Sequence, residues 1–184
     1  MEVLGLVDRL ARARIGGTYN QYAASSLLCD RIRSYLGARW GAPIVLVGEA
    51  AGYRGARVSG IPFTSERQLT GSGPAEATAS IVHRVLAEIG VTDDVLLWNV
   101  VPTHPGTDAS NRRPTRTEIE AAAPFLHEIV AGRAAIAVGR VAAAALDAPY
   151  VRHPSHGGAV EFEEGLRRVL ATIGRRRAPV RPFS

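Results

Sequence analysis

The sequence has one cysteine, no lysine, few aromatic residues and no long apolar run. Because Cys29 is the only cysteine, an intramolecular disulfide and a zinc or iron–sulfur site built from cysteines are excluded. No apolar stretch approaches the length that crosses a bilayer, and the N-terminal residues lack the basic segment of a secretory signal. These absences predict a cytoplasmic protein with no cofactor, no metal and no membrane partner.

All 22 basic side chains among the 184 residues are arginine, and the formal net charge is +5. A basic surface is compatible with a polyanionic partner such as nucleic acid, and equally with a role in solubility. Residues 174–184 carry four arginines and no acid, which predicts a flexible basic tail. We therefore expect one domain over residues 1–173, followed by that tail at residues 174–184.

Short apolar runs alternate with segments of helical spacing along the chain. Four runs have the composition of strands buried on both faces: residues 42–47, 95–98, 134–138 and 149–152. Helical spacing appears at residues 3–14, 23–39, 74–89, 117–130, 139–146 and 159–173. This alternation predicts an α/β fold in three layers, α/β/α, with a central four-stranded parallel sheet.

Polar, Gly- and Pro-rich segments follow three of the expected strands, at residues 48–65, 99–116 and 153–158. In open parallel sheets the working site lies beyond the carboxyl ends of the strands. The sequence therefore predicts that these three segments converge on one face of the molecule.

The first two motifs are loops with small or aromatic residues. Residues 48–52 (GEAAG) leave the first strand, and small residues there let backbone N–H groups approach a ligand. They match neither a dinucleotide fingerprint nor a P-loop, and Glu49 is equally consistent with a helix cap or a surface acid. Phe63, in residues 60–66 (GIPFTSE), offers a face on which a base can stack, worth about 1–3 kcal/mol, although core packing is the ordinary alternative.

The remaining motifs are polar. Asn99 follows the second strand, and its amide can pair one donor and one acceptor with a planar partner, or cap a turn. Residues 111–115 (NRRPT) suit phosphate contacts and lead into a helix capped near Thr115 or Thr117. His153 comes just after the fourth strand and His156 lies three residues on, but no third metal ligand is evident.

In their order along the chain, these segments resemble the uracil-DNA glycosylase superfamily. Residues 48–52 and 60–63 look like motif A (Gly-Glu-Ala-Pro-Gly) and the stacking loop of its thermophile-type, iron–sulfur branch. Residues 96–99 (LLWN) are similar to the strand that ends in the uracil-reading Asn, and residues 111–114 (NRRP) resemble a loop of the same branch. Residues 153–155 (HPS) match motif B.

The resemblance implies hydrolysis of the N-glycosidic bond of flipped-out uracil in DNA. We also expect a monomer with no cofactor. Its iron–sulfur branch needs four cysteines, so a cluster is excluded here. Ala51 replaces the proline of motif A, and Ala50 stands where the best-known branch has its water-positioning Asp. Gly52 stands where the most selective branch excludes the thymine methyl with a Tyr, so we expect weaker exclusion unless Tyr53 or another side chain fills that space.

Carried over residue by residue, the resemblance assigns three groups of positions. The catalytic pair is His153, which donates a hydrogen bond to uracil O2, and Glu49, which orients water or stabilises the sugar cation. The base pocket is formed by Gly48, Ala50, Gly52, Tyr53, Phe63 and Asn99. The DNA contacts come from Arg113, Ser155, His156 and Gly157, with His156 and Gly157 where relatives carry the wedge that fills the vacated stack.

Three other functions remain open on the sequence. The first is a glycosylase that also accepts other deaminated bases, such as hypoxanthine and xanthine. The second is a protein that binds damaged DNA without turnover, although pure binding needs no donor at O2. The third is a hydrolase of soluble nucleotides, for which we would expect a metal-binding acid cluster or a phosphate loop with Lys, and the sequence has neither.

Overall fold

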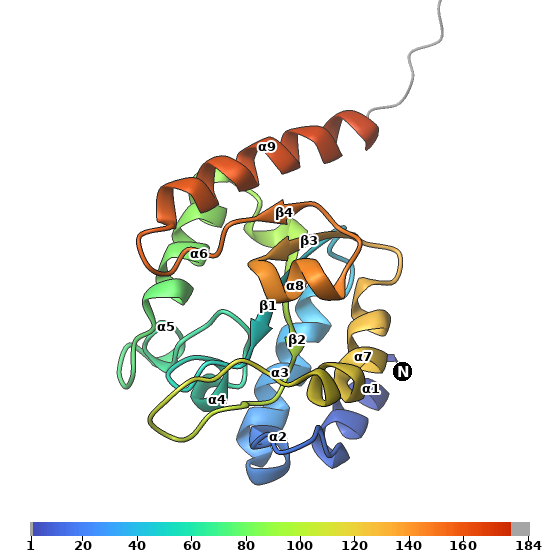
Figure 1. Cartoon of the computed structure of the whole chain (residues 1–184), viewed down its shortest axis with the longest axis vertical. Helices are drawn as coiled ribbons and strands as arrows, with labels where there is room; N and C mark the ends of the chain where they lie inside the picture. The colour runs from blue at the N-terminus through green and yellow to red at the C-terminus, as the bar shows by residue number, and fades with distance from the viewer. Residues whose placement is uncertain (1, 178–184) are drawn as a thin grey trace, which may run out of the picture.

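A computed structural model describes residues 2–177, with side chains for residues 3–174 (Figure 1). The elements in chain order are α1 (Glu2–Arg12), α2 (Gln21–Ala24), α3 (Ser26–Arg39), β1 (Ile44–Ala50), α4 (Ala56–Ser59), α5 (Glu66–Thr70), α6 (Ala77–Ile89), the 3-10 helix η1 (Thr92–Asp94), β2 (Val95–Val101), α7 (Arg116–Val130), β3 (Ala134–Val138), α8 (Arg140–Ala145), β4 (Tyr150–Val151) and α9 (Ala159–Arg177).

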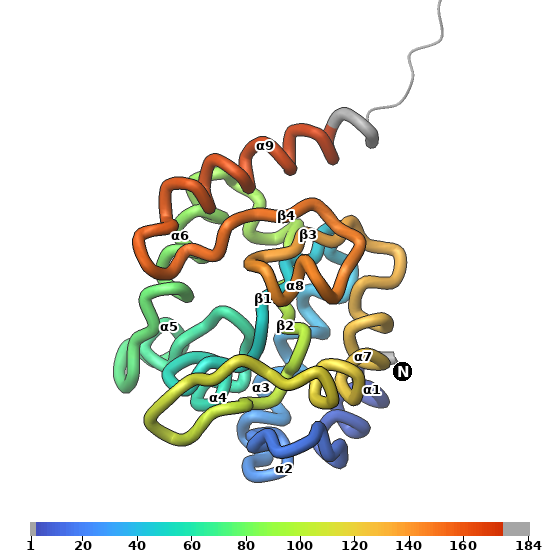
Figure 2. The backbone as a smooth tube through the Cα atoms, viewed as in Figure 1, coloured from blue at the N-terminus to red at the C-terminus, as the bar shows by residue number. Residues whose placement is uncertain are grey.

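The four strands form one parallel sheet in the order β2-β1-β3-β4. Along β1, Val45 and Val47 face one layer of helices while Ile44 and Leu46 face the other, as the period of two in a strand requires. The first core joins the sheet to α1, α3, α7 and α8, and the second joins it to α6 and α9. Figure 2 traces these connections, and the predicted three-layer α/β/α fold is confirmed.

Two strands run further than the sequence indicated. β1 continues to Ala50 and β2 to Val101, because the two pair in parallel register with Gly48 opposite Asn99 and Ala50 opposite Val101. Glu49 therefore lies within a strand and not in a loop, which corrects the prediction for its segment, while Asn99, expected where the second strand ends, lies within β2. Main-chain pairing between strands extended them past the apolar runs, a contribution that composition does not reveal.

The helices differ from prediction mainly at their ends. The expected helix at residues 23–39 is divided at Ser25, whose hydroxyl accepts from the Leu28 N–H and caps α3. The short helices α4 and α5 occur in a region predicted as loop. α9 extends to Arg177, past the predicted end at residue 173, so the expected tail begins as helix, and residues 178–184 lie outside the described residues.

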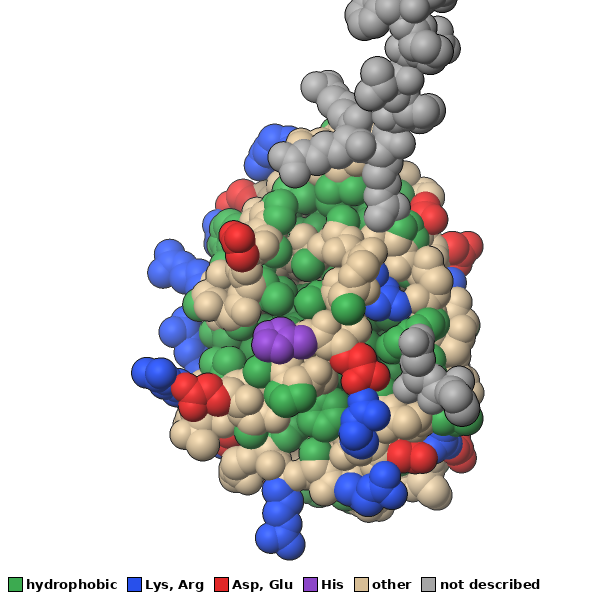
Figure 3. Space-filling model, turned by 90° about the vertical axis from the view of Figure 1, so that its right-hand side faces the viewer, with side chains coloured by type: hydrophobic (Ala, Val, Ile, Leu, Met, Phe, Trp, Pro, Cys, Tyr) green, Lys and Arg blue, Asp and Glu red, His purple; other side chains and the backbone are tan. Residues whose placement is uncertain are grey.

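The surface seen in Figure 3 carries apolar side chains over much of its centre, and arginines gather along the edge that borders the front of Figure 1. Positive charge is thus unevenly spread over the face in this view. Within residues 2–177, no helix combines the length and apolar composition needed to span a membrane.

The start of α7 is held by a buried carboxylate. Thr115 is the N-cap, and the Glu118 side chain accepts from the Thr115 N–H at 2.8 Å in a capping box. Glu118 is 2% exposed and accepts two hydrogen bonds from Arg112, at 2.6 and 2.8 Å. This pairing lowers the pKa of Glu118 to about 2. The cluster ties the loop after β2 to α7.

We expect Glu118→Gln to lower the free energy of unfolding at pH 7 by roughly 1–3 kcal/mol, because it leaves charged hydrogen-bond donors unpaired. The folded-state pKa lies below the ordinary value of 4.5, so this stabilisation is complete above pH 4.5 and is lost as the pH falls towards 2. Urea unfolding of wild type and variant between pH 2 and 7 measures this difference in the free energy of unfolding. Glu120→Gln, at an exposed pair with Arg116, is the control, and an equal loss in both variants would contradict the prediction.

Candidate functional site

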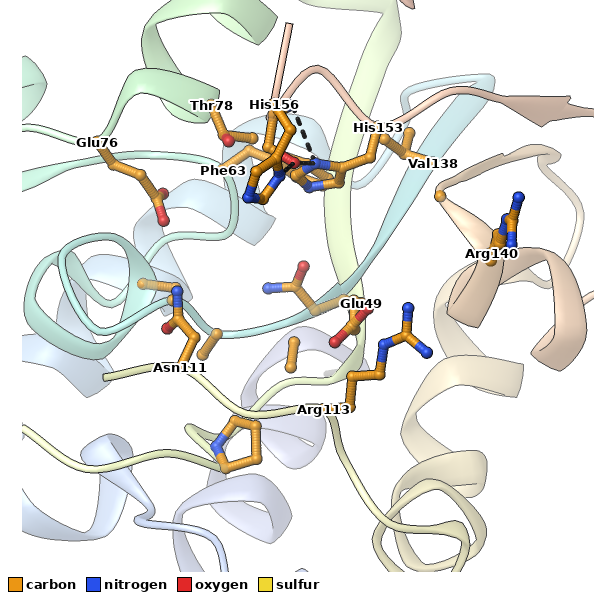
Figure 4. A pocket seen from close by; sticks show the side chains of 18 of the residues that line it. Glu49, Phe63, Glu76, Thr78, Asn111, Arg113, Val138, Arg140, His153 and His156 are labelled. Atoms are coloured by element: carbon orange, nitrogen blue, oxygen red, sulfur yellow. Dashed lines mark hydrogen bonds between the residues drawn. The ribbon is translucent and has the colours of Figure 1, made fainter. Parts of the chain in front are cut away.

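A cavity of about 520 Å³ opens at the carboxyl edge of the sheet (Figure 4). Its lining comes from the ends of all four strands and from the loops that follow them, as predicted for a parallel sheet. Most of the predicted site residues line this cavity: Glu49, Ala50, Gly52, Phe63, Asn99, Arg113, His153, Ser155 and His156. Gly48 lies directly behind it, whereas Tyr53 and Gly157 are not among the lining residues.

The Phe63 ring and the Asn99 amide meet over the backbone of Gly48. A Cβ atom at position 48 would overlap Cζ of Phe63 and lie 2.8 Å from Oδ1 of Asn99, so only glycine leaves room for this approach. Asn99 is 4% exposed, and its amide forms no hydrogen bond with any described residue. Since buried polar groups are nearly always hydrogen-bonded, this amide is available to a ligand.

His153 presents one defined ring nitrogen to the cavity. Its Nδ1 accepts from the Ser155 N–H at 3.2 Å and lies 2.8 Å from the Ser155 hydroxyl. Burial, with a smaller contribution from His156, lowers the pKa of His153, so the ring is neutral at pH 7. Because Nδ1 is an acceptor, the neutral ring carries its hydrogen on Nε2. Nothing in the sequence indicated that Ser155 sets this tautomer.

His156 lies at the rim, in the loop that also holds His153. It is exposed and has a φ of 53°, and Gly157 follows with a φ of 75°. The Nδ1 atom of His156 lies 3.0 Å from the Ser155 hydroxyl, so this hydroxyl joins both imidazole rings (Figure 4). In the described part of the chain, no group of three or more His, Cys, Asp or Glu side chains is arranged to hold a metal ion.

Two carboxylates reach the cavity from different elements. Glu49, near the end of β1, is half-buried, and burial raises its pKa while Arg113 acts in the opposite direction. Glu76 precedes α6 and was not predicted, since no motif surrounds it. Burial raises the pKa of Glu76 as well, and no described residue forms an ion pair or hydrogen bond with its carboxylate. Figure 4 shows Glu76 and Glu49 approaching the cavity from separate sides.

The space beside Gly52 is filled by Glu76 and not by Tyr53. A Cβ atom at Gly52 would overlap the Glu76 carboxylate, and the same is true at Gly55. Tyr53 instead donates its backbone N–H to Oδ1 of Asn111 at 2.9 Å, and its ring lies against the Arg54 guanidinium. Tyr53, which was predicted to form part of the base pocket, is thus not among the residues that line the cavity.

Four arginines line the cavity, and two of them are neutralised within the protein. Arg112 is bound to Glu118, and Arg152 pairs with Glu161 at 2.7 Å. Arg113 and Arg140 form no ion pair with residues in the described range, and both remain free to meet an anion. Arg140, the first residue of α8, was missed from the sequence because it lies outside every motif.

We expect Glu76→Gln to raise the melting temperature at pH 7 by a few degrees, because the substitution removes a desolvated charge that has no partner. Since the pKa of Glu76 is raised in the fold, the native carboxylate is penalised above that pKa, and the gain should vanish below the ordinary value of 4.5. Thermal unfolding between pH 4 and 8 tests this. Asp147→Asn, at an exposed position, controls for net charge, and a gain independent of pH would count against the expectation.

Comparisons with known proteins identify the family and the fold. The family model described as the Uracil DNA glycosylase superfamily matches residues 35–175. A search of curated proteins found no match. The crystal structure of wild-type SMUG2 from Pedobacter heparinus is similar with a TM-score of 0.68 and 11% identity, over 96% of this chain and 99% of that chain, which shows a shared fold. The chain belongs to the uracil-DNA glycosylase superfamily, whose members are DNA glycosylases, hydrolases of DNA repair.

Proposed function

We propose that this protein hydrolyses the N-glycosidic bond of uracil flipped out of DNA and leaves an abasic site. The observation that carries the proposal is the meeting of Phe63, Asn99 and His153 in one cavity. These side chains come from three distant segments, and together they supply a stacking face, an amide pair and a neutral hydrogen-bond donor. A planar base with two carbonyl oxygens and one N–H matches that set.

Recognition of the base rests on Phe63 and Asn99. The ring of Phe63 stacks on uracil while the Asn99 amide accepts from N3–H and donates to O4. Cytosine presents the opposite donor and acceptor pattern at these atoms and would leave buried polar groups unpaired, an expensive mismatch. The unpartnered state of the buried Asn99 amide supports this role.

His153 acts on the charge that develops as the bond breaks. When C1′–N1 cleaves, the electron pair goes to the base, and negative charge grows chiefly on O2. The Nε2–H of a neutral His153 donates a hydrogen bond to this atom, and comparable single donors are worth roughly 3–4 kcal/mol. The lowered pKa of His153 and the acceptor role of its Nδ1 support donation without proton transfer.

The sugar becomes an oxocarbenium ion that water captures. Glu49 orients this water or stabilises the cation electrostatically. Its position across the cavity from His153 places it near the sugar when His153 contacts the base (Figure 4). Extrusion of the base costs a few kcal/mol. His156, exposed at the rim, fills the vacated stack, while Arg113 and Arg140 contact the phosphates beside it.

We expect His153→Ala and Asn99→Ala to slow single-turnover cleavage of uracil-containing DNA by 10²–10³-fold, roughly the loss of one preorganised donor, and Glu49→Ala to slow it as well. His127→Ala, at an exposed position on α7, should cleave at the wild-type rate. Abasic product is measured by alkaline strand scission with a no-enzyme control.

Wild-type rates in the His153 and Asn99 variants would remove the proposed site. Duplexes with hypoxanthine, xanthine and thymine mismatches, assayed beside uracil, define the range of bases. Tight binding of uracil DNA by the wild type without any abasic product would favour the binding protein over the enzyme.

For Arg113→Ala and Arg140→Ala, we expect weaker DNA binding and a slope of log K against log salt reduced by about 1 for each phosphate that the arginine neutralises. Fluorescence anisotropy at several salt concentrations gives both quantities. Arg116→Ala is the control, because Arg116 is highly exposed and pairs with Glu120 outside the cavity. Reduced affinity with an unchanged slope would argue against phosphate contacts.

A further inference from the structure

The described chain contains two non-glycine residues with positive φ, Phe63 and His156, and both line the cavity. Phe63 has a φ of 53°, a left-handed conformation that an L residue with a bulky side chain adopts only when its surroundings enforce it. Backbone strain of this kind persists where other interactions over-determine the geometry. The groups that hold Phe63 in place therefore bear on the function of its ring.

The side of the Phe63 loop nearest α4 is held by hydroxyl groups. Tyr22, from α2, donates to the Gly60 carbonyl at 2.9 Å. Ser59, at the end of α4, is buried and its hydroxyl donates to the Thr64 carbonyl at 2.6 Å while accepting from the Ile61 N–H at 3.1 Å. These bonds fix the path of the backbone from residue 60 to residue 64.

A histidine from α6 contacts the other side of the loop. Nε2 of His83 lies 3.0 Å from the Thr64 hydroxyl, which itself donates to the Pro62 carbonyl at 3.1 Å. A hydrogen bond therefore joins the His83 ring to the hydroxyl of Thr64, the residue directly after Phe63. The imidazole also interacts with the backbone of Phe63, and burial lowers the pKa of His83, which keeps the ring neutral.

The helix that carries His83, α6, is fixed in the hydrophobic core. Val82, Val85 and Leu86 of the same helix are buried against the sheet, in the core that also includes Phe63. His83 itself does not line the cavity, so it does not contact a bound base directly. It can affect the base only through Thr64 and Phe63. A helix anchored in the core is thereby connected to the strained residue of the site.

We propose that His83 is a positioning residue, which holds the Phe63 ring in the orientation required for stacking through its hydrogen bond to Thr64. This inference rests on the proposed function, since it assigns the ring a flipped base as its partner. His83 acts on base recognition and not on contacts with the DNA backbone. Its removal should therefore impair cleavage of uracil DNA and leave the affinity for DNA with an abasic-site analogue unchanged.

The test compares His83→Leu, which removes the hydrogen bond and keeps apolar bulk, with His83→Gln, whose side-chain amide can donate to or accept from the Thr64 hydroxyl. Because one net hydrogen bond corresponds to about a two- to tenfold effect, His83→Leu should slow single-turnover cleavage by that factor. His83→Gln should remain close to wild type. Thr64→Val removes the hydroxyl that His83 contacts and should match His83→Leu, and it replaces that variant in the test if the leucine variant folds poorly.

A double-mutant cycle with Phe63→Ala decides whether the effect passes through the ring. On the proposal, adding His83→Leu to Phe63→Ala causes no further loss of rate, and abasic-analogue DNA binds both His83 variants as tightly as wild type. An equal loss in both backgrounds, or weakened binding of the abasic analogue, overturns it. If Phe63→Ala alone cleaves at the wild-type rate, the stacking role and this inference are wrong, although the proposed hydrolysis stands. If Phe63→Ala is slow and His83→Leu is not, only this inference is wrong. If the wild type itself leaves no abasic product, the proposed function is wrong.

Discussion

The site depends on the close approach of two side chains over a residue that has none. Gly48 and Asn99 lie opposite each other in adjacent parallel strands, on the face of the sheet that is covered by α6. Because position 48 has no Cβ, the Phe63 ring and the Asn99 amide both approach the backbone of Gly48 closely. Register and glycine together therefore bring the Phe63 ring and the Asn99 amide to one place on the sheet, and His153, in the loop after β4, lines the same cavity.

Several local features of the cavity oppose stability. The Asn99 amide is buried without a hydrogen-bond partner among the described side chains, and the desolvated Glu76 carboxylate has none either. Phe63 is held in a strained backbone conformation. Each is unfavourable in the free protein, and strained or unpaired groups of this kind are typical of functional sites. The free energy that offsets these costs comes from the two apolar cores on either side of the sheet and from ion pairs such as Arg112–Glu118.

Much of the fold and part of the site could be predicted, and the failures have physical reasons. Short apolar runs indicated β1 to β4 because strands buried on both faces need them, and Thr115 was found because capping is a local interaction. The ends of β1 and β2 were missed because pairing with a neighbouring strand extended them. Glu76, Arg140 and His83 were missed because no local pattern marks a residue that reaches the site from another element.

The sequence by itself determined the alternation of strands and helices, the edge of the sheet where the polar loops gather, and the chemical types available there, because these follow from periodicity and from residues close along the chain. Only the tertiary structure decided which ring nitrogen of His153 carries hydrogen, that Glu76 and not Tyr53 occupies the space beside Gly52, and which arginines stay unpaired. Those outcomes depend on contacts between segments far apart in the chain, and such contacts exist only after the sheet and its two helical layers have packed.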